Sequence, residues 1–586
     1  MLDTFRQIYV GDFEFRHDDG EPLPQTVWCL VLKELRSGKV SRFYPGDLER
    51  LEGAVPFPTG GDVLYVGFFT PAEWSCHLRL GWAIPENSID LYSEFRWLTS
   101  GLPPRWNNGQ RKGAYSLTRA CAFHGLVHAS ADTKDFMREI AIKGDPTPEQ
   151  LERLVDYCQD DVEATARLFL AMADKIDGPR ALLRGAYCVA VAHMEAAGIP
   201  VDLDLYHSLR DRWEEIKLAL VRERGAPYGV FEGLKLRDKL LEEYIDSRGM
   251  NWPRTPTGRP STDKDTFKSM AGAYPEIEDL YFLVSTLRQL KVFDLPVGSD
   301  GRTRASIMPC SASSGRNAPS TTKFLFCLPA YLRRLAKPPP GRVLVYLDYC
   351  AEEYAIAAAL SQDPEMLRGY LGGDPHLDFA KKAGLVPEDA TKESHARERE
   401  AAKACNFGIL YGMGARALGF RTGKTQAAAA ALLQAHKQSY PRFWQWAEGS
   451  VAMANLRRAI YSRLGWRRLV TPDTRATALQ NFPVQAGGGD CLRAACISLV
   501  KAEIQVSVPV HDAVLVETSE GDVDFEVAKA RQIMGDVSEA LFGIRIRTDT
   551  KLVRWPDRYI DGRGEAIWET VERCLASVYE SAAVRI

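Results

Sequence analysis

The amino-acid sequence predicts a multidomain α/β protein. Its 586 residues exceed the roughly 250 to 300 residues at which one hydrophobic core stops growing. Short apolar runs typical of strands, at 8–15, 62–69 and 343–347, alternate with helical stretches, above all 151–172 and 180–300. A content of 45% hydrophobic and 26% charged residues is that of a globular protein.

The composition excludes several classes of protein. No apolar run reaches about 18 residues, and the start M-L-D-T-F-R lacks the basic and apolar regions of a signal peptide. The 12 cysteines are scattered, which favours reduced thiols over disulfides or a structural zinc site. His124 and His128 have helical spacing, but no Glu follows the first, so a metalloprotease is excluded. We therefore expect a cytoplasmic protein with no membrane partner.

Positive charge is concentrated in one region. The net charge is only −3, so binding to nucleic acid would require a local cluster of cations. Between Phe282 and Val345 there are ten basic residues and two acids. This region is either a phosphate-binding surface or a solvated face.

A stripe with an unusual composition lies at 399–411. Its members, four residues apart, share one helical face: Arg399, Lys403, Phe407 and Tyr411. A core stripe normally carries Leu, Ile or Val, and cations at a helix start oppose the helix dipole. Two cations that hold a triphosphate, followed by rings that stack on a base or sugar, would explain the pattern. An exposed cationic helix start above packed aromatic rings is the alternative.

Two aspartates follow apolar runs. Asp348 ends the run at 343–347, and Asp512 lies between the runs 506–510 and 513–517, which predicts two strands joined by a tight turn. A carboxylate at the end of a buried strand is costly unless it is paired, hydrogen-bonded or bound to a metal. We expect the turn to place Asp512 beside Asp348.

A second set of acids lies near the N-terminus. Asp12 and Glu14 alternate along a short strand and so share a face, where a divalent metal or simple exposure would relieve their repulsion. Tyr157 and Asp161 share a face of the helix predicted at 151–172.

This order of motifs resembles the DnaQ-like 3′→5′ exonucleases, which have an RNase H-like fold. The resemblance implies that Asp12, Glu14 and Asp161 hold two Mg²⁺ or Mn²⁺ ions. It also implies that Tyr157 positions the attacking water. The middle motif departs from the family, and Glu73 is the nearest match to its usual Asp.

The later motifs resemble those of family A DNA polymerases, the bacterial DNA polymerase I family. D-Y-x-x-x-E at 348–353, R-x-x-x-K-x-x-x-F-x-x-x-Y at 399–411 and H-D at 511–512 match the three family motifs in order and spacing. The resemblance covers roughly 186–550 and implies a right-hand polymerase domain at 181–586, after an exonuclease-like domain at 1–180. The implied thumb is at about 181–300, the palm at about 301–365 and 470–586, and the fingers at about 366–469.

The resemblance implies a role for each site residue. Asp348, Asp512 and the Tyr349 carbonyl would ligate two Mg²⁺ ions for in-line phosphoryl transfer. Arg399 and Lys403 would hold the β- and γ-phosphates, and Lys403 is the candidate to protonate the leaving pyrophosphate.

Nucleotide selection is implied for the aromatic half of the stripe. Phe407 would pack against the sugar, and Tyr411 would lie near the templating pair. Glu353, hydrogen-bonded to Tyr411, would occupy the space that a ribose 2′-OH needs and so reject ribonucleotides.

DNA contacts are implied for residues in three further segments. Arg316 resembles the Arg that touches the primer's minor groove, and His511 would lie beside the primer terminus. Asn481 and Gln485 resemble the readers of the template and minor groove, where donors can check the shape of a pair without reading sequence.

The sequence also departs from the family. Ala513 stands where Glu is usual, Thr477 where Arg is usual, and C-A-E at 350–352 where S-Q-I is common. The segment 551–586 matches no catalytic motif, and its amphipathic helix from about Glu565 would brace the palm or contact DNA.

The sequence therefore predicts a DNA-directed DNA polymerase that adds dNTPs to a primer, releases pyrophosphate and proofreads 3′→5′. Expected partners are primer-template DNA, dNTPs and replisome proteins, and a monomer is expected. The length without a 5′-nuclease domain suggests a phage or phage-derived enzyme. A single-subunit RNA polymerase is one alternative, opposed by Glu353 and Phe407. A catalytically inactive primer-template binding protein is the other, opposed by the intact acid and cation set.

Overall fold

The structure is a computed structural model that describes residues 4–103, 113–128, 137, 139–290 and 295–583. The chain forms two compact units. The first comprises residues 1–198, 306–318 and 343–552, and the second comprises 199–305, 319–342 and 553–586.

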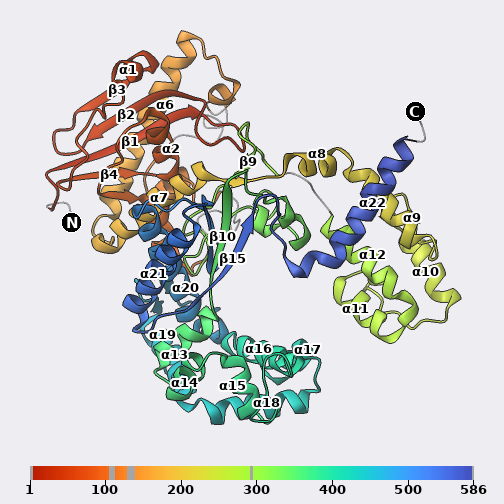
Figure 1. The fold of residues 1–586 in the computed structure, drawn as a ribbon. Helices are drawn as coiled ribbons and strands as arrows, with labels where there is room; N and C mark the ends of the chain where they lie inside the picture. Colours follow the sequence, from red (N-terminus) through yellow and green to blue (C-terminus); the bar gives the residue numbers. More distant parts are fainter. Residues whose placement is uncertain (1–3, 104–112, 129–136, 138, 291–294, 584–586) are drawn as a thin grey trace. The chain divides into compact units, whose positions relative to one another are not determined.

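The first unit begins with a five-stranded mixed sheet in the order β3-β2-β1-β4-β5 (Figure 1). The first three strands are antiparallel neighbours, whereas β4 and β5 continue the sheet in parallel with β1. Every residue of β4 is buried, as expected for a strand covered on both faces. The strands are β1 Gln7–Arg16, β2 Thr26–Glu34, β3 Val40–Phe43, β4 Val63–Gly67 and β5 Ser88–Asp90.

Helices cover both faces of this sheet. The longest, α6, begins at a capping box formed by Thr147 and Gln150 and presents Val155, Cys158 and Val162 to one face. This packing confirms the predicted helix and turns Tyr157 and Asp161 toward β1. Aromatic and small side chains of α2 and α7 fill the other face. The helices are α1 Pro45–Arg50, α2 Pro71–Leu80, α3 Leu91–Thr99, α4 Leu117–Phe123, α6 Pro148–Met172 and α7 Gly178–Ala197.

The first unit also contains a separate four-stranded sheet, in the order β13-β14-β10-β15. The predicted hairpin is confirmed: β13 and β14 pair in antiparallel fashion, and the turn residue His511 has a left-handed φ of 57°. Because β10 lies beside β14, the end of β10 meets this turn. The strands are β10 Arg342–Tyr349, β13 Val506–Val510, β14 Ala513–Ser519 and β15 Thr548–Arg554.

Helices and a small hairpin complete the first unit. The predicted stripe lies on α16, which ends at Leu410 with Tyr411 as its C-cap. The remaining elements are α13 Glu352–Ser361, α14 Pro364–Leu371, α15 Pro375–Lys382, α16 Ala396–Leu410, α17 Ala415–Thr422, α18 Gln426–Ser439, α19 Pro441–Arg457, β11 Ala459–Tyr461, β12 Arg467–Leu469, α20 Ala476–Lys501 and α21 Val523–Phe542.

The second unit is mostly helical, as the sequence predicted for 180–300. Asp263 caps the helix α11, and its side chain accepts from the Thr266 amide. The helices are α8 Leu203–Asp211, α9 Trp213–Gly225, α10 Asp238–Ser247, α11 Lys264–Ala273, α12 Glu278–Gln289 and α22 Glu565–Ala583. Short elements are β6 Ile199–Pro200, β7 Phe231–Glu232, β8 Lys235–Leu236, β9 Arg302–Thr303, η3 Pro275–Ile277, η4 Leu325–Cys327, η5 Ala330–Leu335 and η6 Gly562–Gly564.

The helix predicted from about Glu565 is confirmed as α22, and it packs along α9 (Figure 1). Its buried stripe consists of Trp568, Val571, Cys574 and Val578. All 12 cysteines are free, as predicted. Within the described ranges, no helix is both long and apolar enough to cross a membrane.

Candidate active site

The end of β10 and the β13–β14 turn bring Asp348 and Asp512 together, as predicted. The Tyr349 amide donates to the Asp512 carbonyl at 3.2 Å. Burial raises the pKa of Asp348 to about 7, with the negative charges of Asp512 and Asp549 adding to the effect and Lys403 opposing it. The sequence did not single out Asp549, which reaches this group from β15.

The neighbours of Asp348 are held in place by β-sheet and core contacts. The Tyr349 ring is buried, and its hydroxyl donates to the Met534 carbonyl at 2.8 Å. The backbone carbonyl of Tyr349 is therefore the group of this residue that could ligate a metal ion. Cys350 is half-buried. Burial, together with a hydrogen bond to Asp549, raises the pKa of its thiol to about 12.

This acidic pair fits a divalent cation. Asp348 Oδ1 is buried and has no hydrogen-bond partner among the described residues, and a cation would relieve both that deficit and the repulsion from Asp512. Among all the described residues, at this acidic pair and at the N-terminal sheet alike, no three His, Cys, Asp or Glu side chains are grouped closely enough to hold a metal ion by themselves. The donors present are therefore Asp348, Asp512 and the Tyr349 carbonyl.

Glu353 and Tyr411 form the predicted hydrogen bond. The Tyr411 hydroxyl donates to Glu353 Oε1 at 3.0 Å and accepts from Gln485 Nε2 at 3.0 Å. Glu353 is buried, whereas Tyr411 is 39% exposed. Burial raises the pKa of Glu353, and the Arg316 guanidinium opposes that shift.

Glu352 is a site residue whose role the sequence did not reveal. It is 1% exposed, and its Oε2 lies 3.3 Å from Arg316 Nη2. The same Arg316 nitrogen lies 3.6 Å from Glu353 Oε1, and Arg316 Nε donates to the Gln485 carbonyl at 2.9 Å. Burial raises the pKa of Glu352 to about 8, against the effect of Arg316. A glutamate at the start of the apolar run Y-A-I-A-A-A-L was the available signal.

Two of three successive glycines in α20, Gly488 and Gly489, make room for this arginine and glutamate. A Cβ at Gly488 would lie 2.4 Å from both Arg316 Nη2 and Glu352 Oε2, and one at Gly489 would lie 3.1 Å from Arg316 Cγ. Each glycine inside a helix costs roughly 0.5–1 kcal/mol relative to alanine. Close approach of the two side chains to the α20 backbone explains why glycine occupies these positions.

The cations of α16 are paired with acids. Arg399 Nε lies 2.5 Å from Asp374 Oδ2, and Arg399 Nη1 lies 2.8 Å from Glu400 Oε1. Lys403 is more exposed and lies 3.8 Å from Glu400 Oε2. The Phe407 ring packs beside His376, with 5.8 Å between ring centroids. Arg399 would have to exchange its acidic partners to hold a phosphate.

The remaining predicted DNA contacts lie around α20 and the β13–β14 turn. Asn481 is buried, and its Oδ1 has no partner within the described part of the chain. His511 is exposed at the turn next to Asp512. Thr477 lies close to Gly412, where a Cβ would meet its Cγ2 at 2.7 Å.

A second acidic site lies at the N-terminal sheet and includes Glu73. Burial, and then the charges of Asp12 and Glu14, raise the pKa of Glu73 well above its usual range. Its Oε2 is buried without a partner among the described residues, which again fits a divalent cation. Asp90 accepts from the Phe69 amide at 2.7 Å and so fixes the loop that leads to α2.

The helix α6 completes this site. Tyr157 and Asp161 are both buried, and burial followed by the charges of Asp161 and Glu14 raises the pKa of Tyr157. His128 Nε2 lies 2.7 Å from Asp161 Oδ1. The sequence weighed His128 only with His124, because nothing in its spacing points to an acid 33 residues away.

The four-stranded sheet, the acids at the end of β10 and the cationic helix beside them define the layout of a nucleic acid polymerase. The family model for DNA polymerase family A matches residues 230–555, more than half of the chain. The chain belongs to DNA polymerase family A. The predicted family and polymerase fold class are thus confirmed.

Curated relatives include bacterial and phage polymerases. A thermostable DNA polymerase I of Thermus thermophilus is 26% identical over 413 residues, which cover 63% of this chain and 48% of the relative. The DNA polymerase of Mycobacterium phage D29 is 25% identical over 420 residues, which cover 68% of this chain and 66% of the relative. The chain spans about half the length of the Thermus relatives that it matches.

A solved structure shares the fold. It is described as the POL domain of Pol1 from M. smegmatis in complex with DNA primer-template and dNTP. The match has a TM-score of 0.71 and 18% sequence identity, and it covers 93% of this chain and 94% of the other.

Proposed function

We propose that the chain is a DNA-directed DNA polymerase that extends a primer along a template. The observation that carries the proposal is the meeting of Asp348 and Asp512, from segments 164 residues apart, beside the hydrogen-bonded pair Glu353 and Tyr411. Burial and the charge of Asp512 raise the pKa of Asp348, so a cation bound to this pair of acids would be favoured. Membership of DNA polymerase family A supports the same activity.

Asp348, Asp512 and the Tyr349 carbonyl would hold two Mg²⁺ ions, or Mn²⁺, which would supply the positive charge that phosphoryl transfer requires. The chain's own cations position the nucleotide. Arg399 exchanges Asp374 and Glu400 for phosphate oxygens, and Lys403 adds a second charge that also opposes the raised pKa of Asp348.

Nucleotide selection would rest on the buried Glu353. Its hydrogen bond to Tyr411 holds the carboxylate where a ribose 2′-OH would need space, and Phe407 packs against the sugar. Arg316, Asn481, Gln485 and His511 would then contact the primer-template. Their placement around α20 and the β13–β14 turn supports this assignment.

The proposal includes partners and location. Primer-template DNA and dNTPs would be the substrates, which the complex described for the M. smegmatis neighbour supports. Replisome proteins would be further partners of a cytoplasmic monomer. The phage D29 relative supports a phage or phage-derived enzyme.

Primer extension with Mg²⁺ tests the polymerase, using wild type, Asp512→Ala and Asp524→Ala, in which an exposed acid of α21 is removed as a control. Asp512→Ala should lose activity by at least about 1,000-fold, as removal of a catalytic group does, and Asp524→Ala should retain it. No extension by wild type bound to primer-template would favour the inactive binding protein. Equal use of ribonucleotides and deoxyribonucleotides by wild type would favour an RNA polymerase, and Glu353→Ala should create that behaviour.

A 3′→5′ exonuclease is the second activity we propose. The observation that favours it is the gathering of Asp12, Glu14, Glu73, Tyr157 and Asp161 in one acidic site, on a sheet in the order β3-β2-β1-β4-β5. Asp12, Glu14, Glu73 and Asp161 would hold the metal ions, and Tyr157 would orient the attacking water.

Degradation of a 3′-labelled strand without nucleotides tests this activity. Asp12→Ala should abolish degradation and preserve primer extension, whereas Asp512→Ala should do the reverse. Degradation that persists in Asp12→Ala would refute the assignment of the N-terminal site.

A further inference from the structure

His128 lies beside the N-terminal acidic site and has no role in the proposed chemistry. Its Nε2 lies 2.7 Å from Asp161 Oδ1, and its side chain is only 2% exposed. Asp161 is also buried and would be one of the metal ligands of the proposed exonuclease. Burial of a polar ring is costly unless its nitrogens are hydrogen-bonded, so the partners of His128 indicate what the residue does.

The other ring nitrogen of His128 also has a partner. Nδ1 lies 3.1 Å from the Thr118 hydroxyl. When that hydroxyl donates to Nδ1, the ring proton is on Nε2 and can be donated to Asp161. A ring that carried its only proton on Nδ1 would instead turn a lone pair toward the carboxylate, which is unfavourable. Thr118 and His128 therefore form a chain of hydrogen bonds that ends on Asp161.

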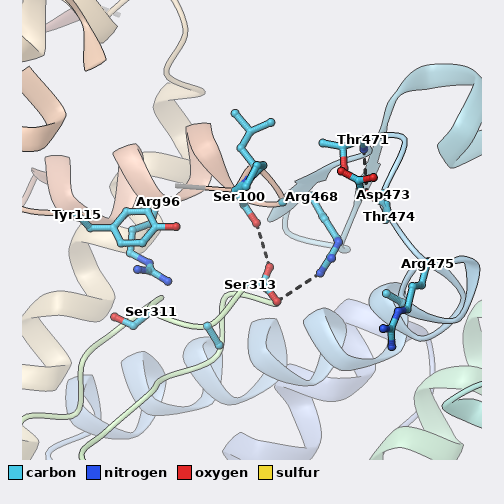
Figure 2. A pocket seen from close by; sticks show the side chains of 15 residues that line it. Arg96, Ser100, Tyr115, Ser311, Ser313, Arg468, Thr471, Asp473, Thr474 and Arg475 are labelled. Carbon is cyan, nitrogen blue, oxygen red and sulfur yellow. Dashed lines mark hydrogen bonds between the residues drawn. The ribbon is translucent and has the colours of Figure 1, made fainter. Parts of the chain in front are cut away.

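Thr118 is held in place at the start of α4. The side chain of Ser116 caps this helix and accepts from the Arg119 amide. The residue before the cap is Tyr115, and Figure 2 shows its ring beside Arg96 of α3. The guanidinium carbon of Arg96 lies 3.8 Å from the centre of this ring. The first turn of α4, and with it the Thr118 hydroxyl, is therefore fixed from the side of α3.

The loop that leads from α4 to His128 is held against α6. Gly125 has a left-handed φ of 72°, which turns the chain directly after the helix. The Val127 carbonyl then accepts from Arg167 Nη2 at 3.4 Å. Arg167 and Asp161 both belong to α6. One helix thus carries the acid and holds the loop that brings His128 to it.

Three roles fit a buried histidine next to an acid: metal ligand, structural contact and positioning residue. A metal ligand would offer one nitrogen to the ion, but both nitrogens of His128 are engaged. A carboxylate has about four acceptor sites on its two oxygens, so a bond to Asp161 Oδ1 leaves Oδ2 available for an ion. Hydrogen bonds from outer residues commonly orient carboxylates that ligate a metal. These contacts favour the positioning role over the ligand role.

The orientation of Asp161 affects a second group of the site. Tyr157 lies one turn earlier on α6, and the charge of Asp161 is among the causes, after burial, that raise the pKa of this phenol. Tyr157 would orient the attacking water in the proposed exonuclease. A change in the direction of the Asp161 carboxylate would therefore disturb both the ion and the phenol.

We propose that His128 is a positioning residue that holds Asp161 in the orientation in which it binds a divalent metal ion, with Thr118 fixing the proton on His128 Nε2. The inference rests on the proposed exonuclease function. It adds two residues that touch neither the ion nor the DNA. The segment that begins at α4 thus contributes to metal affinity through a carboxylate on another helix.

Titration with Mn²⁺, followed by electron paramagnetic resonance, tests the proposal without turnover. The full chain carries Asp348→Ala and Asp512→Ala as a background, so that the polymerase site does not bind the ion. Adding Asp12→Ala should abolish the strongest remaining Mn²⁺ binding and so identify the N-terminal site. Adding His128→Leu instead should weaken that binding by roughly 10- to 100-fold, as loss of a hydrogen bond to a metal ligand does.

Matched variants in this background make the result specific. His128→Gln should retain most of the affinity, because its amide Nε2 can replace the ring N–H as the donor. Thr118→Val should weaken binding by roughly 2- to 10-fold, equal to one hydrogen bond, and Thr118→Ser should not. His124→Leu is the control, since His124 lies in the same loop and packs on Phe95 and Phe123. Thermal melts confirm that each variant folds.

The Mg²⁺ dependence of 3′-strand degradation separates positioning from a structural role, with His128→Leu as the single change. The Mg²⁺ concentration for half-maximal rate should rise by roughly the same 10- to 100-fold, and saturating Mg²⁺ should restore most of the rate. A structural role would lower the maximal rate and leave the half-maximal concentration unchanged. Primer extension should match wild type, because Asp348 and Asp512 are intact.

Two results would overturn the inference alone. One is Mn²⁺ binding that depends on Asp12 but keeps its affinity in His128→Leu. The other is equal weakening in His128→Leu and His124→Leu, which would show that packing of the loop is what matters. Absence of any Mn²⁺ binding that depends on Asp12 would refute the proposed exonuclease site, and this inference with it.

Discussion

Glu352 and Glu353 are neighbours in sequence but have different partners. Glu353 accepts a hydrogen bond from Tyr411, whereas Glu352 lies deeper and approaches Arg316. Both carboxyl groups have raised pKa values because burial disfavours their charge. The proposed nucleotide site therefore contains two acids whose ionisation is disfavoured by burial and only partly compensated by Arg316.

Glu352 should make stability depend on pH. Its folded-state pKa of about 8 exceeds the ordinary value of 4.5, so the folded chain keeps a proton that the unfolded chain releases between those values. Stability should therefore fall as pH rises from about 4.5 to about 8, by at most about 1.4 kcal/mol for each unit of pKa elevation. Glu352→Gln should raise the Tm relative to wild type at pH 8.5 and change it little at pH 5.

Glu365→Gln is the matched control. Hydrogen bonds from Lys382 and Arg368 lower the pKa of Glu365 to about 2, so it is charged at both pH values. Its substitution should shift the Tm equally at pH 5 and pH 8.5. A shift for Glu352→Gln that does not depend on pH would contradict the assigned protonation.

The sequence predicted which site residues lie together where regular strands or helices fix their positions. Asp348 and Asp512 could be paired because two apolar runs predicted a hairpin, and Tyr157 and Asp161 because of helical spacing. Glu352 and His128 could not be predicted, since each depends on a partner brought close by tertiary packing. A contact between segments that are far apart in the sequence leaves no periodic pattern of residues from which it could be predicted.

At the scale of the element, α20 combines unfavourable residues with a central position. It contains Pro483 and three successive glycines, yet it runs for 26 residues through the first unit. Tertiary packing overrides helix propensity here, because two of these glycines, Gly488 and Gly489, admit the side chains of Arg316 and Glu352. The same override explains why propensity alone gives a poor account of this helix.

Gly488→Ala and Gly449→Ala should have opposite effects. The Gly488 change should displace Arg316 and Glu352, reduce stability by about 1–3 kcal/mol through overpacking, and slow primer extension by roughly 100-fold through misplacement. Gly449 lies inside α19 with open space around it, so Gly449→Ala should raise the free energy of unfolding by about 0.5–1 kcal/mol. Denaturant unfolding and single-turnover extension measure both. Normal extension by Gly488→Ala would show that the close approach is not needed.

At the scale of the molecule, charge is arranged less simply than the sequence suggested. Much of the basic region between 282 and 345 is paired with acids inside the second unit, so it is not a uniform phosphate-binding face. These pairs are Arg304 with Asp300, Arg333 with Asp561, Arg334 with Glu565, and Lys337 with Asp202. A count along the sequence could not reveal them, because three of the four acids lie outside the run.

Trp568→Ala tests how α22 supports the second unit. Removal of this buried ring, which also lies under the Arg334 guanidinium, should cost about 3–5 kcal/mol locally. Amide hydrogen exchange should accelerate in α9, on which α22 packs, and stay unchanged in α13. Glu572→Ala, which removes an exposed side chain of the same helix, is the control. Unchanged exchange in α9 would show that α22 does not stabilise it.

The half-buried Cys350 has a practical consequence. Cys327 and Cys350 are the cysteines that are not fully buried, and Asp549 and Asp348 help to keep the Cys350 thiol protonated. Only a thiolate reacts readily with alkylating reagents, so Cys350 should be slow to react. Asp549→Asn should accelerate its alkylation, as should Mg²⁺ added to wild type, while Cys327 keeps a constant rate. Mass spectrometry of alkylation at this one thiol would then report the charge state of the neighbouring acids without a substrate or turnover.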